Sequence, residues 1–298
     1  VVAGDPVINL ERARNNQNQT SFLYAKDSDG KQIEVLRLHG EENRIWVDFD
    51  KIPKQMKDAF IALEDKRFNN HHGVDWIRTI GVFVKQNDQG GSTITQQLVK
   101  NITGNNQVTY VRKYNEILSA LNLEKNFNKD QILEAYLNTI YLGQGCYGVE
   151  TAAETYFGKS VDELNVAECA VIASITQMPY SYDPINNPEN NRKRQIYCLD
   201  EMLDQEKITK KEYDEAVNYH LIYTTDDDYV PSEAELERRK NEENAKASSE
   251  FQSFYVDYVI DDVIARLQSD LGYSANEARD VIYGGGLRIY TAVDLDVQ

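Results

Sequence analysis

The fold is decided by the stretch Pro53-Lys-Gln-Met-Lys-Asp-Ala-Phe-Ile-Ala-Leu-Glu-Asp65. Its apolar residues Met56, Phe60 and Leu63 recur at i, i+4 and i+7, the spacing of one face of an α-helix. Proline suits the first turn of a helix, because its missing N–H would have no intrahelical partner there. The pattern therefore predicts a helix that starts near Pro53 and ends at two adjacent carboxylates.

Regular patterns continue on both sides of this helix. Before it, Ser21–Ala25 and Gln32–Leu38 predict strands around Asp29-Gly30, a dipeptide typical of a hairpin turn, and residues 44–50 are a third candidate. After it, helical spacing predicts helices at residues 74–86, 93–103, 109–126, 129–142, 148–157, 161–177, 188–206 and 209–220. The predicted fold class is mainly α, with short N-terminal β-strands.

Capping and hydropathy support this assignment. Several predicted helices begin with a capping box, in which a Thr or Asn precedes Glu or Gln by three positions: Thr93…Gln96, Asn128…Gln131 and Thr209…Glu212. The most apolar run, Ala167–Ile175, contains Glu168 and predicts a buried helix. No run approaches the 18 apolar residues of a membrane span.

Composition excludes several classes of function. The chain has 298 residues, 41% hydrophobic and 27% charged, as in globular proteins, and a formal net charge of −17, which argues against nucleic acid as a partner. Three cysteines and four histidines, without an H-E-x-x-H pattern, make a thiolate or histidine metal centre unfavourable. The charge lies mainly in residues 200–280, with 22 acidic and nine basic residues, whereas residues 58–140 carry nine of each.

Three stretches carry residues suited to chemistry. Glu64–Gly73 places carboxylates at a helix C-terminus, where the negative end of the dipole suits a base. Gly90–Asn101 leads two glycines into a capped helix with a polar stripe, a natural anion site. Arg112-Lys-Tyr-Asn-Glu116 puts two cations and a carboxylate on one helix face. Taken singly, the first and third are also explained as exposed charged helix surface, and the second as plain capping.

Together the three stretches suit a reaction that expels a phosphate. A diphosphate leaving group needs cations, whereas a glycosidase needs a second carboxyl acid to protonate its leaving oxygen. A base followed by Lys100, Arg112 and Lys113 matches the first requirement.

At this point the chain resembles a known family, the family 51 peptidoglycan glycosyltransferases of class A penicillin-binding proteins and monofunctional transglycosylases. The resemblance rests on Glu64-Asp-x-x-Phe-x-x-His-x-Gly73, Gly91-Ser-Thr-Ile-Thr-Gln-Gln97, Arg112-Lys-x-x-Glu116 and Lys129-x-x-Ile-Leu-Glu-x-Tyr-Leu-Asn138, in this order and spacing. Ala153-x-x-Tyr-Phe-Gly-Lys159 and Asn187-Pro188 agree as well. The resemblance covers roughly residues 20–220.

The resemblance implies a lysozyme-like fold with a small membrane-facing lobe and a lipid II substrate. By position, Glu64 resembles the general base of an inverting β-1,4 transfer, and Glu116 resembles a residue that positions the diphosphate or a divalent metal. Residues that resemble substrate and diphosphate ligands are Asp65, Phe68, His71, Thr93, Gln97, Lys100, Asn101, Arg112 and Lys113. Glu134, Tyr136 and Asn138 look more like support for the fold.

Further expectations concern organisation and partners. We expect residues 1–50 to form a β segment following a removed membrane anchor, 51–222 to form the glycosyltransferase domain, and 223–298 to form an acidic helix and linker leading toward a transpeptidase domain absent here. The resemblance is compatible with Mg²⁺ or Mn²⁺, needs no organic cofactor, and implies a growing glycan strand, the membrane surface and cell-wall synthesis proteins as partners. It places the protein at the extracytoplasmic face of the bacterial membrane. A lysozyme-like hydrolase and an inactive cell-wall scaffold remain as alternatives.

Overall fold

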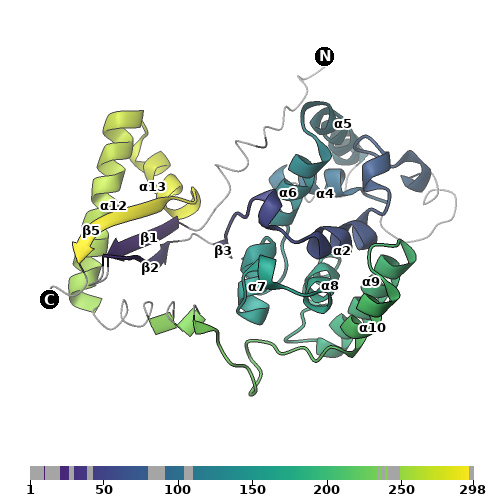
Figure 1. Cartoon of the computed structure of the whole chain (residues 1–298). Helices are drawn as coiled ribbons and strands as arrows, with labels where there is room; N and C mark the ends of the chain where they lie inside the picture. The colour runs from purple at the N-terminus through teal and green to yellow at the C-terminus, as the bar shows by residue number, and fades with distance from the viewer. Residues whose placement is uncertain are drawn as a thin grey trace, which may run out of the picture. The chain divides into compact units, whose positions relative to one another are not determined.

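The computed structural model describes residues 10, 21–26, 30–38, 43–79, 91–103, 110–233, 235–236, 239–240 and 249–294. The chain divides into two compact units (Figure 1). The helical unit comprises residues 1–13 and 47–229, and the sheet unit comprises residues 14–46 and 230–298.

The helical unit confirms the mainly α class. Its helices are α2 (Lys54–Glu64), α4 (Ile94–Thr103), α5 (Tyr110–Asn126), α6 (Lys129–Thr139), α7 (Val149–Phe157), α8 (Val166–Ile175), α9 (Pro188–Asp204) and α10 (Lys210–Asn218). Shorter elements are the 3₁₀ turns η1 (Phe49–Lys51), η2 (Phe68–Asn70) and η3 (Val161–Glu163), and the strand β4 (Cys146–Tyr147).

The core of this unit is built around α8. All residues from Ala167 to Ile175 are buried, as predicted, and the helix packs against α2, α7, α9 and α10. Its buried Glu168 is paired with Lys159 Nζ at 2.6 Å, which compensates the loss of hydration. A second packing centre joins α4 to α5 and α6. The two centres meet the C-terminal end of α2 from different sides (Figure 1).

Two element predictions are wrong. The single helix predicted over 161–177 is η3 followed by α8, because the Asn165 side chain caps the Glu168 N–H and starts a new helix. The strand predicted over 44–50 is reduced to β3 (Asn43–Arg44), because the Val47 backbone exchanges hydrogen bonds with the Asn138 side chain instead of a strand.

The remaining boundaries agree within a few residues. The capping boxes at Thr93, Asn128 and Thr209 are all present. Of the helix predicted over 74–86, residues 76–79 are helical, and residues 80–90 lie outside the described residues. Asp29 of the predicted hairpin turn is also outside them.

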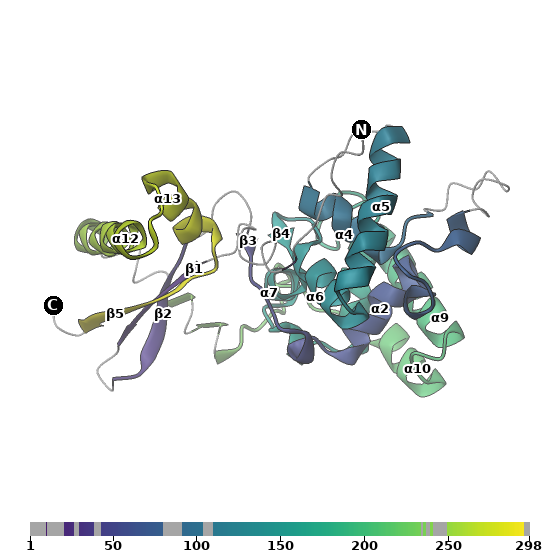
Figure 2. The same ribbon diagram turned by 90° about the horizontal axis from the view of Figure 1, so that it is seen from above.

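The sheet unit joins the two ends of the sequence. Its strands β1 (Ser21–Lys26), β2 (Gln32–Leu38) and β5 (Arg288–Asp294) lie in the order β2-β1-β5, with β1 antiparallel to β2 and parallel to β5. Figure 2 shows α12 (Ser249–Leu271) and α13 (Ala275–Gly284) on one side of this sheet. None of the helices described in either unit is both long enough and apolar enough to cross a membrane.

Candidate active site

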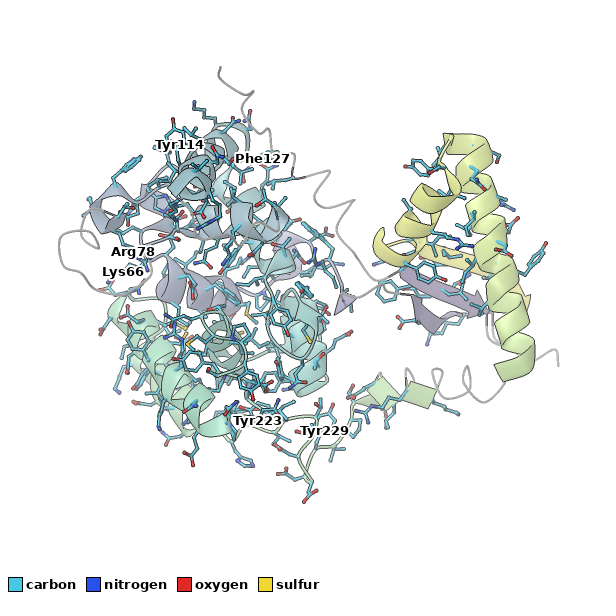
Figure 3. All side chains as sticks on the ribbon, turned by 180° about the vertical axis from the view of Figure 1, so that it is seen from behind. Lys66, Arg78, Tyr114, Phe127, Tyr223 and Tyr229 are labelled. Atoms are coloured by element: carbon cyan, nitrogen blue, oxygen red, sulfur yellow. The ribbon has the colours of Figure 1, made fainter. Side chains whose placement is uncertain are left out.

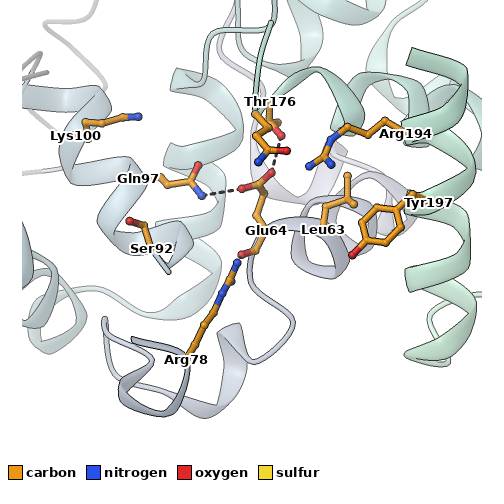
Figure 4. A pocket seen from close by; sticks show the side chains of 10 residues that line it. Leu63, Glu64, Arg78, Ser92, Gln97, Lys100, Thr176, Arg194 and Tyr197 are labelled. Carbon is orange, nitrogen blue, oxygen red and sulfur yellow. Dashed lines mark hydrogen bonds between the residues drawn. The ribbon is translucent and has the colours of Figure 1, made fainter. Parts of the chain in front are cut away.

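Glu64, the last residue of α2, is held at a fixed position by two neutral donors. Its Oε1 accepts a hydrogen bond from Thr176 Oγ1 at 2.6 Å, and its Oε2 accepts one from Gln97 Nε2 at 2.8 Å (Figure 4). Each oxygen of a carboxylate has two acceptor positions, so both oxygens keep one for a further donor. The group is therefore oriented and still able to receive a proton.

This carboxylate opens into a pocket of about 510 Å³. The lining residues come from α2, the helical residues 76–79, α4, α9 and the loops between them: Leu63, Glu64, Arg78, Ser92, Gln97, Lys100, Thr176, Gln177, Arg194 and Tyr197. One carboxylate thus faces three cationic side chains. The excess of positive charge makes the pocket suitable for an anionic ligand.

The charges of the three cations are not neutralised by an ion pair with Glu64. Among the described residues, Arg78, Lys100 and Arg194 form no ion pair with a carboxylate. Arg78 donates instead to the backbone carbonyl of Glu64, and the Arg194 guanidinium lies 5.2 Å from the Tyr182 ring centroid. Their charges are therefore available to a ligand that enters the pocket.

Tyr197 lies beside Arg194, the cation on α9. Its pKa is raised by burial and by the hydrogen bond and charge of Glu201, while Arg194 and Arg78 act in the opposite direction. The phenol is therefore neutral at physiological pH and offers a hydroxyl and an aromatic face beside Arg194, whose guanidinium is 6.0 Å from its ring centroid.

A second polar cluster reaches the pocket at Ser92. The buried Glu116 carboxylate accepts hydrogen bonds from Arg112 and Lys113, one turn earlier on α5, and from Gln96 Nε2 at 3.2 Å. Lys113 Nζ also donates to Ser92 Oγ at 2.8 Å, and Ser92 lines the pocket. The structure therefore brings Glu64, Gln97 and Lys100 together, with the Glu116 cluster at their border.

Four residues predicted as substrate contacts are buried and do not line this pocket: Asp65, Phe68, His71 and Thr93. Asp65 Oδ2 accepts the Ile94 N–H at 3.0 Å and contacts His71 Nε2 at 2.8 Å. Thr93 Oγ1 donates to the Gly73 carbonyl at 2.6 Å. These contacts fix the start of α4 against the segment that follows Glu64, and so set the distance between Glu64 and α4.

Asn101, the remaining predicted contact, also does not line the pocket. It is partly buried on α4, one residue beyond Lys100, and its Nδ2 is buried without a hydrogen-bond partner among the described residues.

The residues around Glu116 do not fit a protein-held divalent metal. No group of three His, Cys, Asp or Glu side chains that could hold a metal ion occurs in the described parts of the chain. Both Glu116 oxygens accept from cations, whereas Mg²⁺ requires about six oxygen ligands.

Sequence reasoning did not name seven of the ten lining residues as site residues: Leu63, Arg78, Ser92, Thr176, Gln177, Arg194 and Tyr197. Arg194 had a local signal, since Arg192-Lys-Arg194 is a basic run shortly before the acidic region. Thr176 had none, because it follows a buried helix 112 positions after Glu64 and meets it only in the folded chain.

Comparisons with known proteins relate the chain to one family. The family model described as Transglycosylase matches residues 29–203. Penicillin-binding protein 1A of Aquifex aeolicus (strain VF5) is 36% identical over 285 residues, which cover 94% of this chain and 34% of that protein. Penicillin-binding protein 1A of Clostridium perfringens (strain ATCC 13124) is 35% identical over 312 residues, covering 100% and 35%.

A crystal structure of Penicillin-Binding Protein 1A from Haemophilus influenzae aligns with a TM-score of 0.42 and 22% identity, covering 92% of this chain and 27% of that one. The chain spans about a third of the length of the curated relatives described above. The family model covers more than half of the chain, and the whole chain aligns with relatives above 30% identity. The chain therefore belongs to the Transglycosylase family, as its four ordered motifs predicted.

Proposed function

We propose that this chain is a peptidoglycan glycosyltransferase that polymerises lipid II into β-1,4-linked glycan and releases undecaprenyl diphosphate. The observation that carries the proposal is the pocket in which one oriented carboxylate, Glu64, stands among three cations that form no ion pair with a carboxylate in the described part of the chain.

Glu64 is the general base of the proposed reaction. It takes the proton from the 4-hydroxyl of the acceptor sugar, and that oxygen attacks the anomeric carbon of the growing chain. The bond between this carbon and the diphosphate oxygen breaks, and the diphosphate leaves with the bonding electrons. Attack opposite to the leaving group inverts the anomeric centre.

Two lysines support departure of the diphosphate. Lys100 lines the pocket, and Lys113 reaches it through Ser92, so both lie where a developing negative charge would be stabilised. A hydrolase of the lysozyme type would need a second carboxyl acid, whereas Glu64 is the one carboxylate among the described residues that line the pocket. The lining therefore favours the transferase over the hydrolase.

A lipid-linked substrate places the proposed reaction at a membrane surface, which we propose to be the extracytoplasmic face. Apolar side chains exposed on the helical unit support a membrane-facing lobe: Trp76, Ile77, Val111 and Tyr114. Figure 3 shows Tyr114 at the surface of this unit. A divalent ion, if the reaction uses one, would take most of its ligands from the substrate diphosphate and water.

The test is polymerisation of fluorescent lipid II in detergent with Mg²⁺ or Mn²⁺, comparing wild type, Glu64→Gln and Glu215→Gln. Glu64→Gln keeps the shape of the site, because its carbonyl can face Gln97 Nε2 while the Thr176 hydroxyl rotates to accept from its NH₂. Glu215, an exposed residue on α10, provides the same chemical change outside the pocket.

We expect glycan from wild type and Glu215→Gln, and a loss of about 10²- to 10⁴-fold in Glu64→Gln. Cleavage of finished glycan by the wild type would favour the hydrolase. A folded wild type without either activity would favour the scaffold. Full activity of Glu64→Gln would refute the assigned base.

A further inference from the structure

A chain of two hydrogen bonds connects the core of the helical unit to the base. Tyr136 lies on α6 with its side chain fully buried, and its hydroxyl donates to Gln97 Oε1 at 3.0 Å. Gln97 Nε2 then donates to Glu64 Oε2 at 2.8 Å. Tyr136 does not line the pocket, and its hydrogen-bonded connection to Glu64 runs through Gln97.

Burial fixes the direction of these two hydrogen bonds, from the Tyr136 hydroxyl toward Glu64. A buried hydroxyl must find an acceptor for its hydrogen, and within the described residues the acceptor for Tyr136 is the Gln97 carbonyl oxygen. Burial, together with the negative charges of Glu64 and Asp65, raises the pKa of Tyr136 well above its ordinary value. The phenol therefore remains protonated and remains a donor.

As a consequence, one of the two possible orientations of the Gln97 side-chain amide is favoured over the other. The two ends of a glutamine amide have nearly the same shape, so packing alone does not distinguish them. With its oxygen held by Tyr136, the NH₂ group faces Glu64 and donates to it. The reversed orientation would set the amide oxygen against the carboxylate and leave the buried phenol without an acceptor.

We infer that Tyr136 is a positioning residue, which orients the Gln97 amide so that the Glu64 carboxylate is held for proton transfer. The inference rests on the proposed function. It assigns to Tyr136 a role beyond support of the fold, and it predicts an effect on turnover that passes through Gln97.

Tyr136→Phe is the test variant, since it removes the hydroxyl and keeps the ring that packs edge-on against Phe60 with centroids 6.0 Å apart. Tyr156→Phe is the matched control: Tyr156 is equally buried, donates to the Leu142 carbonyl at 2.8 Å, and lies outside the pocket. Both variants lose one buried hydroxyl and one hydrogen bond.

Kinetics of lipid II polymerisation are measured for both variants and for Gln97→Met with and without Tyr136→Phe. We expect Tyr136→Phe to lower kcat about 3- to 10-fold, the range for a neutral hydrogen bond, with KM within about twofold. Tyr156→Phe should keep the wild-type kcat. In the Gln97→Met background, Tyr136→Phe should have no further effect.

A second readout needs no turnover. The Gln97 side-chain NH₂ resonance, identified by its loss in Gln97→Met, should shift in Tyr136→Phe and stay in place in Tyr156→Phe. Unchanged kcat and an unchanged resonance in Tyr136→Phe would overturn the inference, as would additive effects of Tyr136→Phe and Gln97→Met. A wild type that makes no glycan would count against the proposed function, and the resonance would still decide whether Tyr136 orients Gln97.

Discussion

Replacing Gly73 by alanine should disturb the site, because the Gly73 backbone packs directly against the backbone of α5 and leaves no room for a Cβ. Gly73 has φ +88°, and an added Cβ would stand 2.6 Å from the Ala120 carbonyl oxygen on α5. Gly145 is a matched control, because its φ of +74° is similar and no heavy atom lies within 4 Å of its added Cβ. The two variants therefore share the cost of the left-handed conformation and differ in the clash.

The magnitudes follow from these two costs. A left-handed non-glycine residue costs about 1–2 kcal/mol, and overpacking of this kind adds about 1–3 kcal/mol. The smaller entropy of alanine in the unfolded chain affects both variants equally and cancels in the comparison. At about 2–4 °C per kcal/mol for a domain of this size, Gly73→Ala should melt about 2–12 °C below Gly145→Ala.

The assay is differential scanning calorimetry of the two variants, followed by polymerisation rates below both transitions. Ala120 lies one turn after Glu116, so a displaced α5 should also slow polymerisation in Gly73→Ala. Equal melting temperatures would refute the reasoning, because they would show that α5 yields to the added methyl group without cost.

Further predictions concern charge and thiols. Lys100→Met should lower kcat/KM for lipid II by about 10- to 100-fold, the range for a charge-assisted hydrogen bond, and Lys100→Arg should restore part of it. Burial raises the pKa of Asp75, but the Arg78 N–H and the Arg67 guanidinium outweigh it and lower the value. Its stabilisation is thus fully present above the unfolded pKa of about 3.9 and is lost as the pH falls through the lower pKa of the folded state. In urea titrations, wild type should exceed Asp75→Asn in stability at pH 7 and approach it toward pH 3; a constant difference would contradict this. The three cysteines, Cys146, Cys169 and Cys198, are all buried, and burial raises the pKa of Cys146 to about 11. A thiol reagent should therefore modify these cysteines only in the unfolded protein.

Local patterns predicted much of the fold and part of the site. The stripe of Met56, Phe60 and Leu63 predicted α2, and the capping residues predicted helix starts, because both signals act within a few positions. The same reasoning placed Glu64, Gln97 and Lys100 on elements that do converge on one pocket.

What the sequence did not show depends on partners far along the chain. Thr176 reaches Glu64 only because α8 packs against α2, and no periodicity encodes that contact. The Val47 backbone is held by the Asn138 side chain, 91 positions away, which replaced an expected strand. The burial of Asp65 arises in the same way, since its partner, the Ile94 N–H, belongs to another helix, and His71 in turn contacts Asp65.

The pairing of β1 with β5 has a consequence for synthesis of the protein. Phe22 is aligned with Arg288, so the first strand emerges from the ribosome long before its neighbour. At about 5–20 residues per second, the wait is roughly 13 to 53 s, which is long compared with helix formation in the intervening segment. During that interval one edge of β1 has no strand beside it, and an exposed edge can pair with other chains. Of the two units, the sheet unit is thus the one that is completed later, and its waiting strand edge is open to binding by a chaperone.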